Sequence, residues 1–178
     1  MSKLDVAFSD YLKETYNVLS RDGVLLVSQA HPDKPNIMAI GWGSVGIIWG
    51  KPIFIVLVRP SRHTYGCIEK VPEFTVNVPT PEMKSVIEFC GSRSGRDFDK
   101  FKETGVTRLP SANVEPPLIK ECAIHYECRV VHRNDVRPDE LARTIITGVY
   151  AQGDFHRVYF GEILRTCIDV DKIETLRG

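Results

Sequence analysis

The chain has 178 residues, of which 43% are hydrophobic and 26% charged, and its 23 basic and 23 acidic residues give a formal net charge of zero. This is the composition of an ordinary globular chain, and the length fits one domain over residues 1–178. A balanced charge provides no general attraction to nucleic acid or to an anionic membrane surface. We therefore expect neither of these partners.

Targeting and cysteine signals are weak. The sequence opens without a positively charged, apolar secretory leader, and its longest apolar runs are far shorter than a membrane span. Five cysteines, an odd number without Cys-x-x-Cys spacing, argue against a disulfide framework or a zinc site. We expect reduced thiols, no metal and a cytoplasmic location.

The first third of the chain predicts one helix followed by strands. A helix is expected over 8–18, within an N-terminal helical segment 1–20, because apolar residues recur on one side. Apolar, β-branched runs predict strands over 24–28, 36–42 and 53–58. The glycine-rich segment 41–50 is expected to connect the last two strands.

The remainder alternates short helices with strands less regularly. Helices are expected over 64–70, 81–90, 98–103 and 138–146, and strands over 74–78, 123–132 and 156–166, with a proline-rich loop at 106–121 and a C-terminal tail at 165–178. In the strand 123–132, apolar residues at 124, 126, 128 and 130 alternate with polar ones, which is typical of a half-buried antiparallel strand.

The order of these elements favours a mainly β protein. The helices do not alternate regularly with the strands, so a doubly wound parallel sheet is disfavoured. An antiparallel barrel with α insertions fits better, because barrel closure leaves no exposed sheet edge.

Two polar stretches have the chemistry of a phosphate site. The stretch Arg59–Thr64 ends an apolar strand, and the stretch Ser92–Phe101 follows later; both combine arginines, small hydroxyl residues and a helix start. Guanidinium groups bind phosphate bidentately, and free N–H groups at a helix N-terminus bind anions. In a chain without net charge, these stretches predict a local site for a phosphorylated small molecule. Solvated turns with surface ion pairs are the open alternative.

Three other motifs are weaker. The string Gly41–Gly46 matches G-x-G-x-x-G, but β-branched residues and Pro52 follow it instead of a helix, so a Rossmann site is disfavoured. The five histidines show no metal-binding spacing. Cys90, on the apolar face of an expected helix, fits a buried small hydrophobe better than a nucleophile.

Five stretches in one order resemble the flavin reductase-like family of FMN-binding split barrels, in particular its flavoredoxin-like branch. The resemblance covers about residues 20–165, and its stretches are 36–44, 52–64, 73–77, 90–101 and 153–163. It implies a small antiparallel split β-barrel that forms a homodimer, with FMN near the subunit interface. The chain departs from the family at Ala39-Ile40, where many relatives carry a hydroxyl residue.

The resemblance also implies the residues of the site. The FMN phosphate would be held by Arg59, Ser61, Arg62 and Thr64, helped by Ser92, Ser94 and Lys100. The flavin ring would lie along Gly41, Trp42, Gly43 and Ser44, with Asn77 close to it and His156 approaching from the last strand, in cis or from the other subunit. Met38, Ala39, Ile40, Cys90 and Gly91 complete the expected cofactor-binding set.

Three functions fit this resemblance. The first is an NAD(P)H-dependent flavin oxidoreductase, in which NADH or NADPH delivers hydride to FMN. The second is an electron carrier with tightly held FMN that a redox protein partner reduces. The third is a noncatalytic flavin-binding dimer. Because the cofactor supplies the chemistry, no catalytic residue is assigned beyond His156 as a candidate near the flavin.

Overall fold

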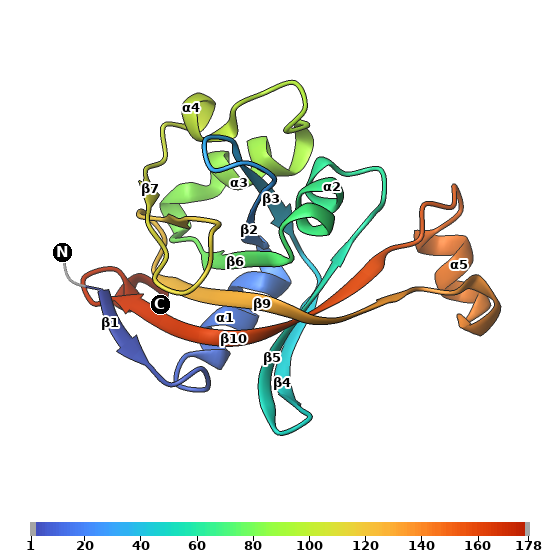
Figure 1. Ribbon diagram of the computed structural model, residues 1–178, viewed down its shortest axis with the longest axis horizontal. Coiled ribbons are helices and arrows are strands. Elements are labelled where there is room, and N and C mark those ends of the chain that lie inside the picture. The colour runs from blue at the N-terminus through green and yellow to red at the C-terminus, as the bar shows by residue number, and fades with distance from the viewer. Residues whose placement is uncertain (1–2, 177–178) are drawn as a thin grey trace.

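The computed structural model describes residues 3–176, which form a strongly curved antiparallel sheet with helices around it (Figure 1). The strands are β1 (Lys3–Val6), β2 (Val24–Gln29), β3 (Pro35–Ile40), β4 (Gly43–Ile48), β5 (Lys51–Val58), β6 (Glu73–Val78), β9 (Ile124–Asp135) and β10 (Arg157–Asp169). They follow the order β3-β2-β6-β9-β10-β5-β4, and β1 also pairs with β10. All of these pairings are antiparallel.

The order of the strands leaves β3 and β4 at its two ends. Gly41 and Trp42 alone connect these two strands, so the chain crosses directly from one end of the sheet to the other. The barrel is therefore split between β3 and β4, and the expected antiparallel split-barrel architecture with helical insertions is confirmed.

The helices are short and lie between the strands. They are α1 (Leu12–Arg21), α2 (His63–Lys70), α3 (Lys84–Ser92), α4 (Lys100–Thr104) and α5 (Arg143–Val149), with 3₁₀ turns η1 (Pro81–Met83), η2 (Pro138–Glu140) and η3 (Ile173–Leu176). In Figure 1, α2, α3 and α4 lie on the side of β2 and β3, whereas α1 lies behind the long strands β9 and β10. Two residue pairs form a separate small sheet, β7 (Arg108–Leu109) with β8 (Leu118–Ile119).

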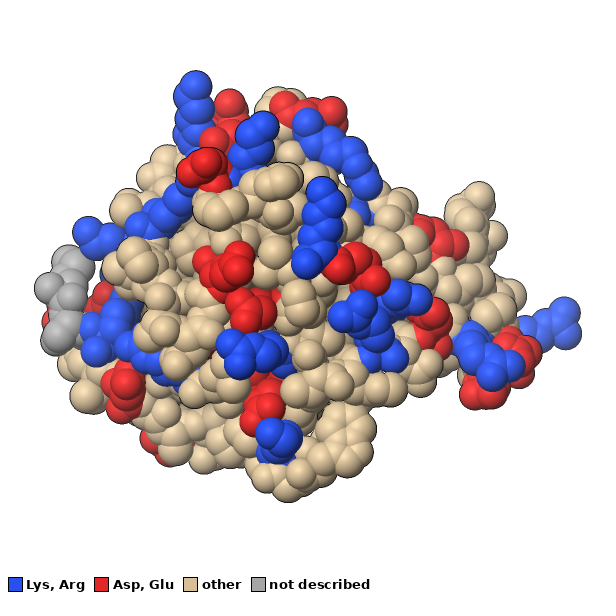
Figure 2. Space-filling view, in the orientation of Figure 1, with Lys and Arg blue, Asp and Glu red and all other residues tan. Residues whose placement is uncertain are grey.

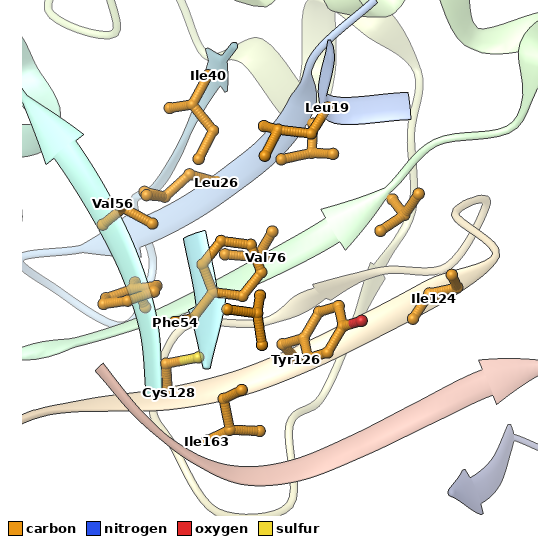
Figure 3. Packing of buried hydrophobic residues seen from close by; sticks show 14 of the residues in the cluster. Leu19, Leu26, Ile40, Phe54, Val56, Val76, Ile124, Tyr126, Cys128 and Ile163 are labelled. Carbon is orange, nitrogen blue, oxygen red and sulfur yellow. The ribbon is translucent and has the colours of Figure 1, made fainter. Parts of the chain in front are cut away.

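The barrel interior is filled by large apolar side chains from facing strands (Figure 3). Phe54 of β5 meets Tyr126 of β9 edge to face, with ring centroids 5.3 Å apart. The Tyr126 hydroxyl lies 2.8 Å from that of Thr15, which anchors α1 to the core. Gly161 in β10 makes room for Phe74, because a Cβ at Gly161 would lie 2.4 Å from that ring.

The segment expected as a loop, 41–50, contains the strand β4. Its residues pair with β5 from Gly43 opposite Val56 to Ile48 opposite Lys51. Trp49 and Gly50 turn the hairpin with positive φ of 55° and 70°, as two-residue hairpin turns require. The glycines of this segment made it resemble a loop in the sequence, although its β-branched residues pair with the neighbouring strand β5.

The N-terminal segment 1–20 is not wholly helical, and 165–178 is not merely a tail. Residues 3–6 form β1, paired with residues 166–169 of β10, and the helix begins only at Leu12. Residues 1–2 and 177–178 lie outside the described residues. The pairing joins segments more than 150 positions apart, so no local sequence signal reveals it.

The polar face of β9 is also more buried than its alternation indicates. His125 and Glu127 are both fully buried. The Glu127 carboxylate accepts hydrogen bonds from the backbone N–H groups of Ala112 and Asn113 and from Arg165. The segment expected as a loop at 106–121 therefore covers this face of the strand.

Beyond the barrel, β9 and β10 continue as a two-stranded arm that ends in η2 and α5 (Figure 1). No residue of α5 is buried. Acidic and basic residues are interspersed on the face shown in Figure 2, without a large area of one sign. No helix among residues 3–176 is both long and apolar enough to cross a membrane.

Candidate functional site

A pocket of about 340 Å³ lies where the open end of the barrel meets α2 and α3. Four parts of the chain form it: the end strand β3 with the turn after it, the corner between β5 and α2, the connection from α3 to α4, and the start of β10. Its lining residues are Asn36, Met38, Ala39, Ile40, Gly41, Trp42, Leu57, Arg59, Ser61, Arg62, His63, Thr64, Cys90, Gly91, Arg93, Ser94, Gly95, Arg96, Lys100 and His156.

The corner between β5 and α2 supplies groups that attract anions. Arg62 is the N-cap residue of α2, and its guanidinium forms no hydrogen bond or ion pair with the described part of the chain. The first N–H groups of a helix have no partner within it, and those of His63 and Thr64 stand at this end of α2. An unpaired guanidinium next to a helix N-terminus is well suited to phosphate.

Arg59 and Ser61 line the same corner but are already engaged by residues 149–154. The Arg59 guanidinium donates hydrogen bonds to the carbonyl oxygens of Val149, Gly153 and Asp154 at 3.1–3.3 Å. The backbone N–H and hydroxyl of Ser61 donate to the Asp154 carboxylate at 3.3 and 2.6 Å. Sequence chemistry treats the two arginines alike, whereas the structure leaves only Arg62 unpaired.

The second polar stretch, Ser92–Phe101, contacts the first, Arg59–Thr64. The Arg96 guanidinium donates to the Ser61 carbonyl oxygen at 2.9 Å, so the two stretches predicted from the sequence are in direct contact. Gly95 lies so close to Asn36 that a Cβ at position 95 would be 1.8 Å from Asn36 Oδ1. The Asn36 side chain donates from Nδ2 to the Thr64 hydroxyl at 2.8 Å.

Lys100 joins the wall of the pocket to the sheet. Its side chain is buried, and Nζ donates to the carbonyl oxygens of Ile37 and Cys90, both at 2.8 Å. Burial lowers the pKa of this ammonium group from its ordinary value. Two of its three N–H donors therefore hold β3 against the end of α3, and one remains for a ligand.

The opposite end of the pocket is formed by strand edge and aromatic rings. Strand β3 pairs only with β2, so along Met38–Ile40 the backbone groups that alternate residues direct away from β2 are not used by the sheet. Trp42 is 50% exposed, and its ring lies 5.3 Å from that of His156. This end can accept a flat ring against backbone and aromatic surface.

His156 reaches the pocket from the same chain that forms the rest of it. Burial, followed by the charge of Arg59, lowers the pKa of His156 to about 4. The ring is therefore neutral at physiological pH. Its Nδ1 lies 2.7 Å from the Tyr150 hydroxyl.

Four residues implied by the resemblance do not line the pocket. Gly43 and Ser44 belong to β4, where Ser44 Oγ lies 3.3 Å from the Tyr16 hydroxyl. The Ser92 hydroxyl donates to the Glu88 carbonyl oxygen in its own helix. Asn77 is buried beside His125, whose Nδ1 lies 2.8 Å from Asn77 Oδ1. The side chains of Ser44, Ser92 and Asn77 therefore have structural partners elsewhere, and Gly43 pairs with β5 through its backbone.

Six lining residues lie outside the set implied by the resemblance: Asn36, Leu57, His63, Arg93, Gly95 and Arg96. Four of them, His63, Arg93, Gly95 and Arg96, lie within the two phosphate-like stretches, so proximity in sequence was an available signal. Asn36 begins the strand expected over 36–42. No sequence signal marked Leu57 as a pocket residue, because an apolar residue inside a strand cannot be distinguished from a core residue.

The pocket contains no obvious nucleophile. Burial raises the pKa of the Cys90 thiol to about 11, which keeps it protonated. Within residues 3–176, no group of three or more His, Cys, Asp or Glu residues is arranged to hold a metal ion. The chemical resources of the site are cationic and hydrogen-bonding groups at one end and a neutral aromatic surface at the other.

An antiparallel split barrel with an anion-attracting pocket at its open end defines the structural class of this protein. The model of the flavin reductase like domain matches residues 19–176, and the chain belongs to that family.

An uncharacterized protein of Pyrococcus abyssi is 34% identical over 68% of this chain and 69% of its own length. The crystal structure of flavoredoxin from Methanosarcina acetivorans is 25% identical, with a TM-score of 0.65 over 96% of this chain and 77% of that one. Flavoredoxin of Desulfovibrio vulgaris has a similar fold, with a TM-score of 0.67 at 23% identity over 84% of this chain and 70% of its own.

Proposed function

We propose that the protein binds FMN, with the phosphate at the corner between β5 and α2. The observation that carries this proposal is the unpaired guanidinium of Arg62 at the N-terminus of α2, inside a pocket that Arg93, Arg96 and Lys100 also line. A phosphate dianion would neutralise part of this positive cluster and would bind the free N–H groups of the helix.

The other end of the pocket fits a flavin ring. The open edge of β3 offers backbone donors and acceptors beside Met38, Ala39 and Ile40. Trp42 and His156 supply flat surface, so a planar ring with polar edges is matched by both kinds of group. The hydroxyl missing at Ala39-Ile40 is replaced in this arrangement by the backbone of β3.

Bound FMN supplies electron and hydride transfer. The chain binds the phosphate, orients the ring along β3 and limits the access of water. No nucleophile or metal is required of the protein. We propose an NAD(P)H-dependent flavin oxidoreductase, which takes its electrons from NADH or NADPH.

An electron carrier is the second candidate, because a flavoredoxin is among the similar structures. A carrier would hold FMN permanently and accept electrons from a redox protein.

Anaerobic mixing of the FMN-loaded protein with reduced nicotinamide separates the two candidates. We expect bleaching of the flavin in about a second or less. No bleaching over many minutes with either nucleotide, together with rapid reduction by a partner protein, would instead establish the carrier. A noncatalytic flavin-binding dimer would be reduced by neither donor.

We also propose a homodimer. The arm carries α5 without a single buried residue, and Ile47 and Trp49 on the β4–β5 hairpin are each 61% exposed. A helix of seven residues with no buried side chain is marginal in water, so we expect a second copy of the chain to pack against the arm. Light scattering should report a dimer; a stable monomer with full FMN affinity would contradict this proposal.

The cofactor is tested on the protein as it is purified. We expect a yellow protein that releases FMN, and not FAD or riboflavin, when it is denatured. A colourless protein that binds no FMN after incubation with an excess would refute the proposed function.

A further inference from the structure

Tyr150 and His156 form a buried pair at the ring end of the pocket. The Tyr150 hydroxyl lies 2.7 Å from His156 Nδ1, and the two side chains are 5% and 8% exposed. Both residues belong to the segment 150–156 that connects α5 to β10, and of the two only His156 lines the pocket. Binding of the phosphate does not require this pair.

The protons of the pair can be placed by satisfying every polar atom. If His156 Nδ1–H donated to Tyr150, the phenolic hydrogen would need another acceptor, and the described residues provide none. If the phenol donates instead, both the hydroxyl hydrogen and Nδ1 are satisfied. A neutral imidazole then carries its one proton on Nε2. Buried polar groups are nearly always paired, which favours the second arrangement.

Neighbouring groups hold this arrangement from both sides. Arg59 lies over the Tyr150 ring at 5.2 Å, and Phe155 stacks on that ring at 4.6 Å. Trp42 lies against the other member of the pair, His156. The charged groups that influence the pKa of His156 are Arg59 and Arg62, which lower it, and Asp154, which raises it; burial exceeds all three and keeps the ring neutral.

We propose that Tyr150 is a positioning residue that fixes His156 in the Nε2–H form, so that His156 presents a neutral N–H donor to the pocket. We assign this donor to an acceptor atom of the flavin ring system, and this assignment rests on the proposed function. A neutral donor stabilises electron density on the ring without releasing a proton to it. The tyrosine acts through the histidine and does not itself touch the ligand.

The tautomer is tested by ¹⁵N NMR of protein labelled on histidine and free of ligand, with His156→Gln to assign the signal. We expect Nδ1 to resonate as a hydrogen-bonded acceptor and Nε2 as an N–H nitrogen, without titration between about pH 5.5 and 8. In Tyr150→Phe, the Nδ1 signal should lose the shift caused by the hydrogen bond. A protonated Nδ1 in the wild type, or an Nδ1 signal that Tyr150→Phe leaves unchanged, would overturn the proposal.

The partner of the donor is tested by adding FMN to the same samples. We expect the Nε2 signal of His156 to move and Nδ1 to remain an acceptor. FMN binding without a change at Nε2 would overturn this part of the proposal, while the proposed function would stand. An absence of FMN binding would overturn the proposed function, and the spectrum without ligand would still decide the tautomer.

Discussion

At the residue scale, the two arginines of one short stretch have different tasks. Arg59 is committed to the carbonyl oxygens of residues 149–154. Arg62 is unpaired among the described residues and lines the pocket. The sequence predicted an anion site here but could not distinguish a residue that supports the site from one that is free to bind. That distinction depends on a segment about ninety positions away.

Replacing Arg62 by Ala should therefore weaken FMN binding selectively. A charge-assisted hydrogen bond contributes about 1.5–3 kcal/mol, which corresponds to a roughly 10- to 150-fold rise in Kd. Fluorescence titration with FMN and riboflavin measures the effect, and riboflavin, which lacks the phosphate, should be hardly affected. Arg129→Ala, at an exposed ion pair with Glu73, is the matched control. A loss of affinity that is equal for both ligands would show that Arg62 does not bind the phosphate.

Replacing Gly95 by Ala should destabilise the pocket. The new methyl group would overlap Asn36 Oδ1, and Asn36 is buried and bonded to Thr64. Overpacking of this kind costs about 1–3 kcal/mol, which thermal unfolding detects, and FMN affinity should fall with it. Gly148→Ala is the control, because nothing lies within 4 Å of a Cβ there. Equal melting temperatures for the two variants would argue against the close contact.

At the scale of elements, the site depends on how the loop between α5 and β10 is bound to the corner between β5 and α2. Asp154 adopts a positive φ of 55° and directs its carboxylate to the N–H and hydroxyl of Ser61. Ser61 therefore cannot donate to a phosphate while Asp154 holds it. The carboxylate also places a negative charge beside the positive cluster.

Asp154→Asn should strengthen FMN binding, by about tenfold, because it removes a negative charge beside the proposed phosphate position. Asparagine tolerates positive φ as aspartate does, and the loop should keep its shape. The FMN and riboflavin affinities of the two proteins are compared at one ionic strength, with Asp154→Glu retaining the charge. Weaker FMN binding in Asp154→Asn would mean that the carboxylate supports the site.

The sequence predicted most elements because their signals are local. The strands β2, β5 and β6 and the helix α2 lie within two residues of their expected bounds, since apolar runs end at clear turn residues. β1 and β4 were missed for different reasons: β1 depends on a distant partner, and the glycines of β4 resemble those of a loop. Within the site, the two phosphate-like stretches do meet, whereas Asn77 and Ser92 are used for internal hydrogen bonds.

At the scale of the whole molecule, a buried polar cluster joins the two ends of the described chain. Lys3 Nζ lies 2.7 Å from His125 Nε2 and 3.3 Å from the Asp169 carboxylate. Burial, reinforced by the charges of Lys3 and Lys172, holds the pKa of His125 well below its ordinary value of 6.5. The folded protein therefore contains a neutral histidine that the unfolded chain would protonate.

This difference predicts the direction of the pH dependence of stability. Below about pH 6.5, His125 is protonated in the unfolded state but stays neutral in the folded state. The free energy of unfolding therefore falls as the pH falls, by at most about 1.4 kcal/mol per pH unit for this group. Denaturant unfolding between pH 5 and 7.5 measures the slope, which should be shallower in His125→Gln. The exposed His31→Gln serves as the control. An unchanged slope in His125→Gln would refute this assignment.

Calorimetric titration of the ligand-free protein with FMN and riboflavin tests most directly whether the pocket binds FMN through its phosphate. Both ligands carry the same ring and ribityl chain, so any difference between them reports on the phosphate contacts at Arg62 and the N-terminus of α2. We predict that FMN binds at least tenfold more tightly than riboflavin and that added salt narrows the difference. Equal affinities, or no binding of either ligand, would contradict the claim.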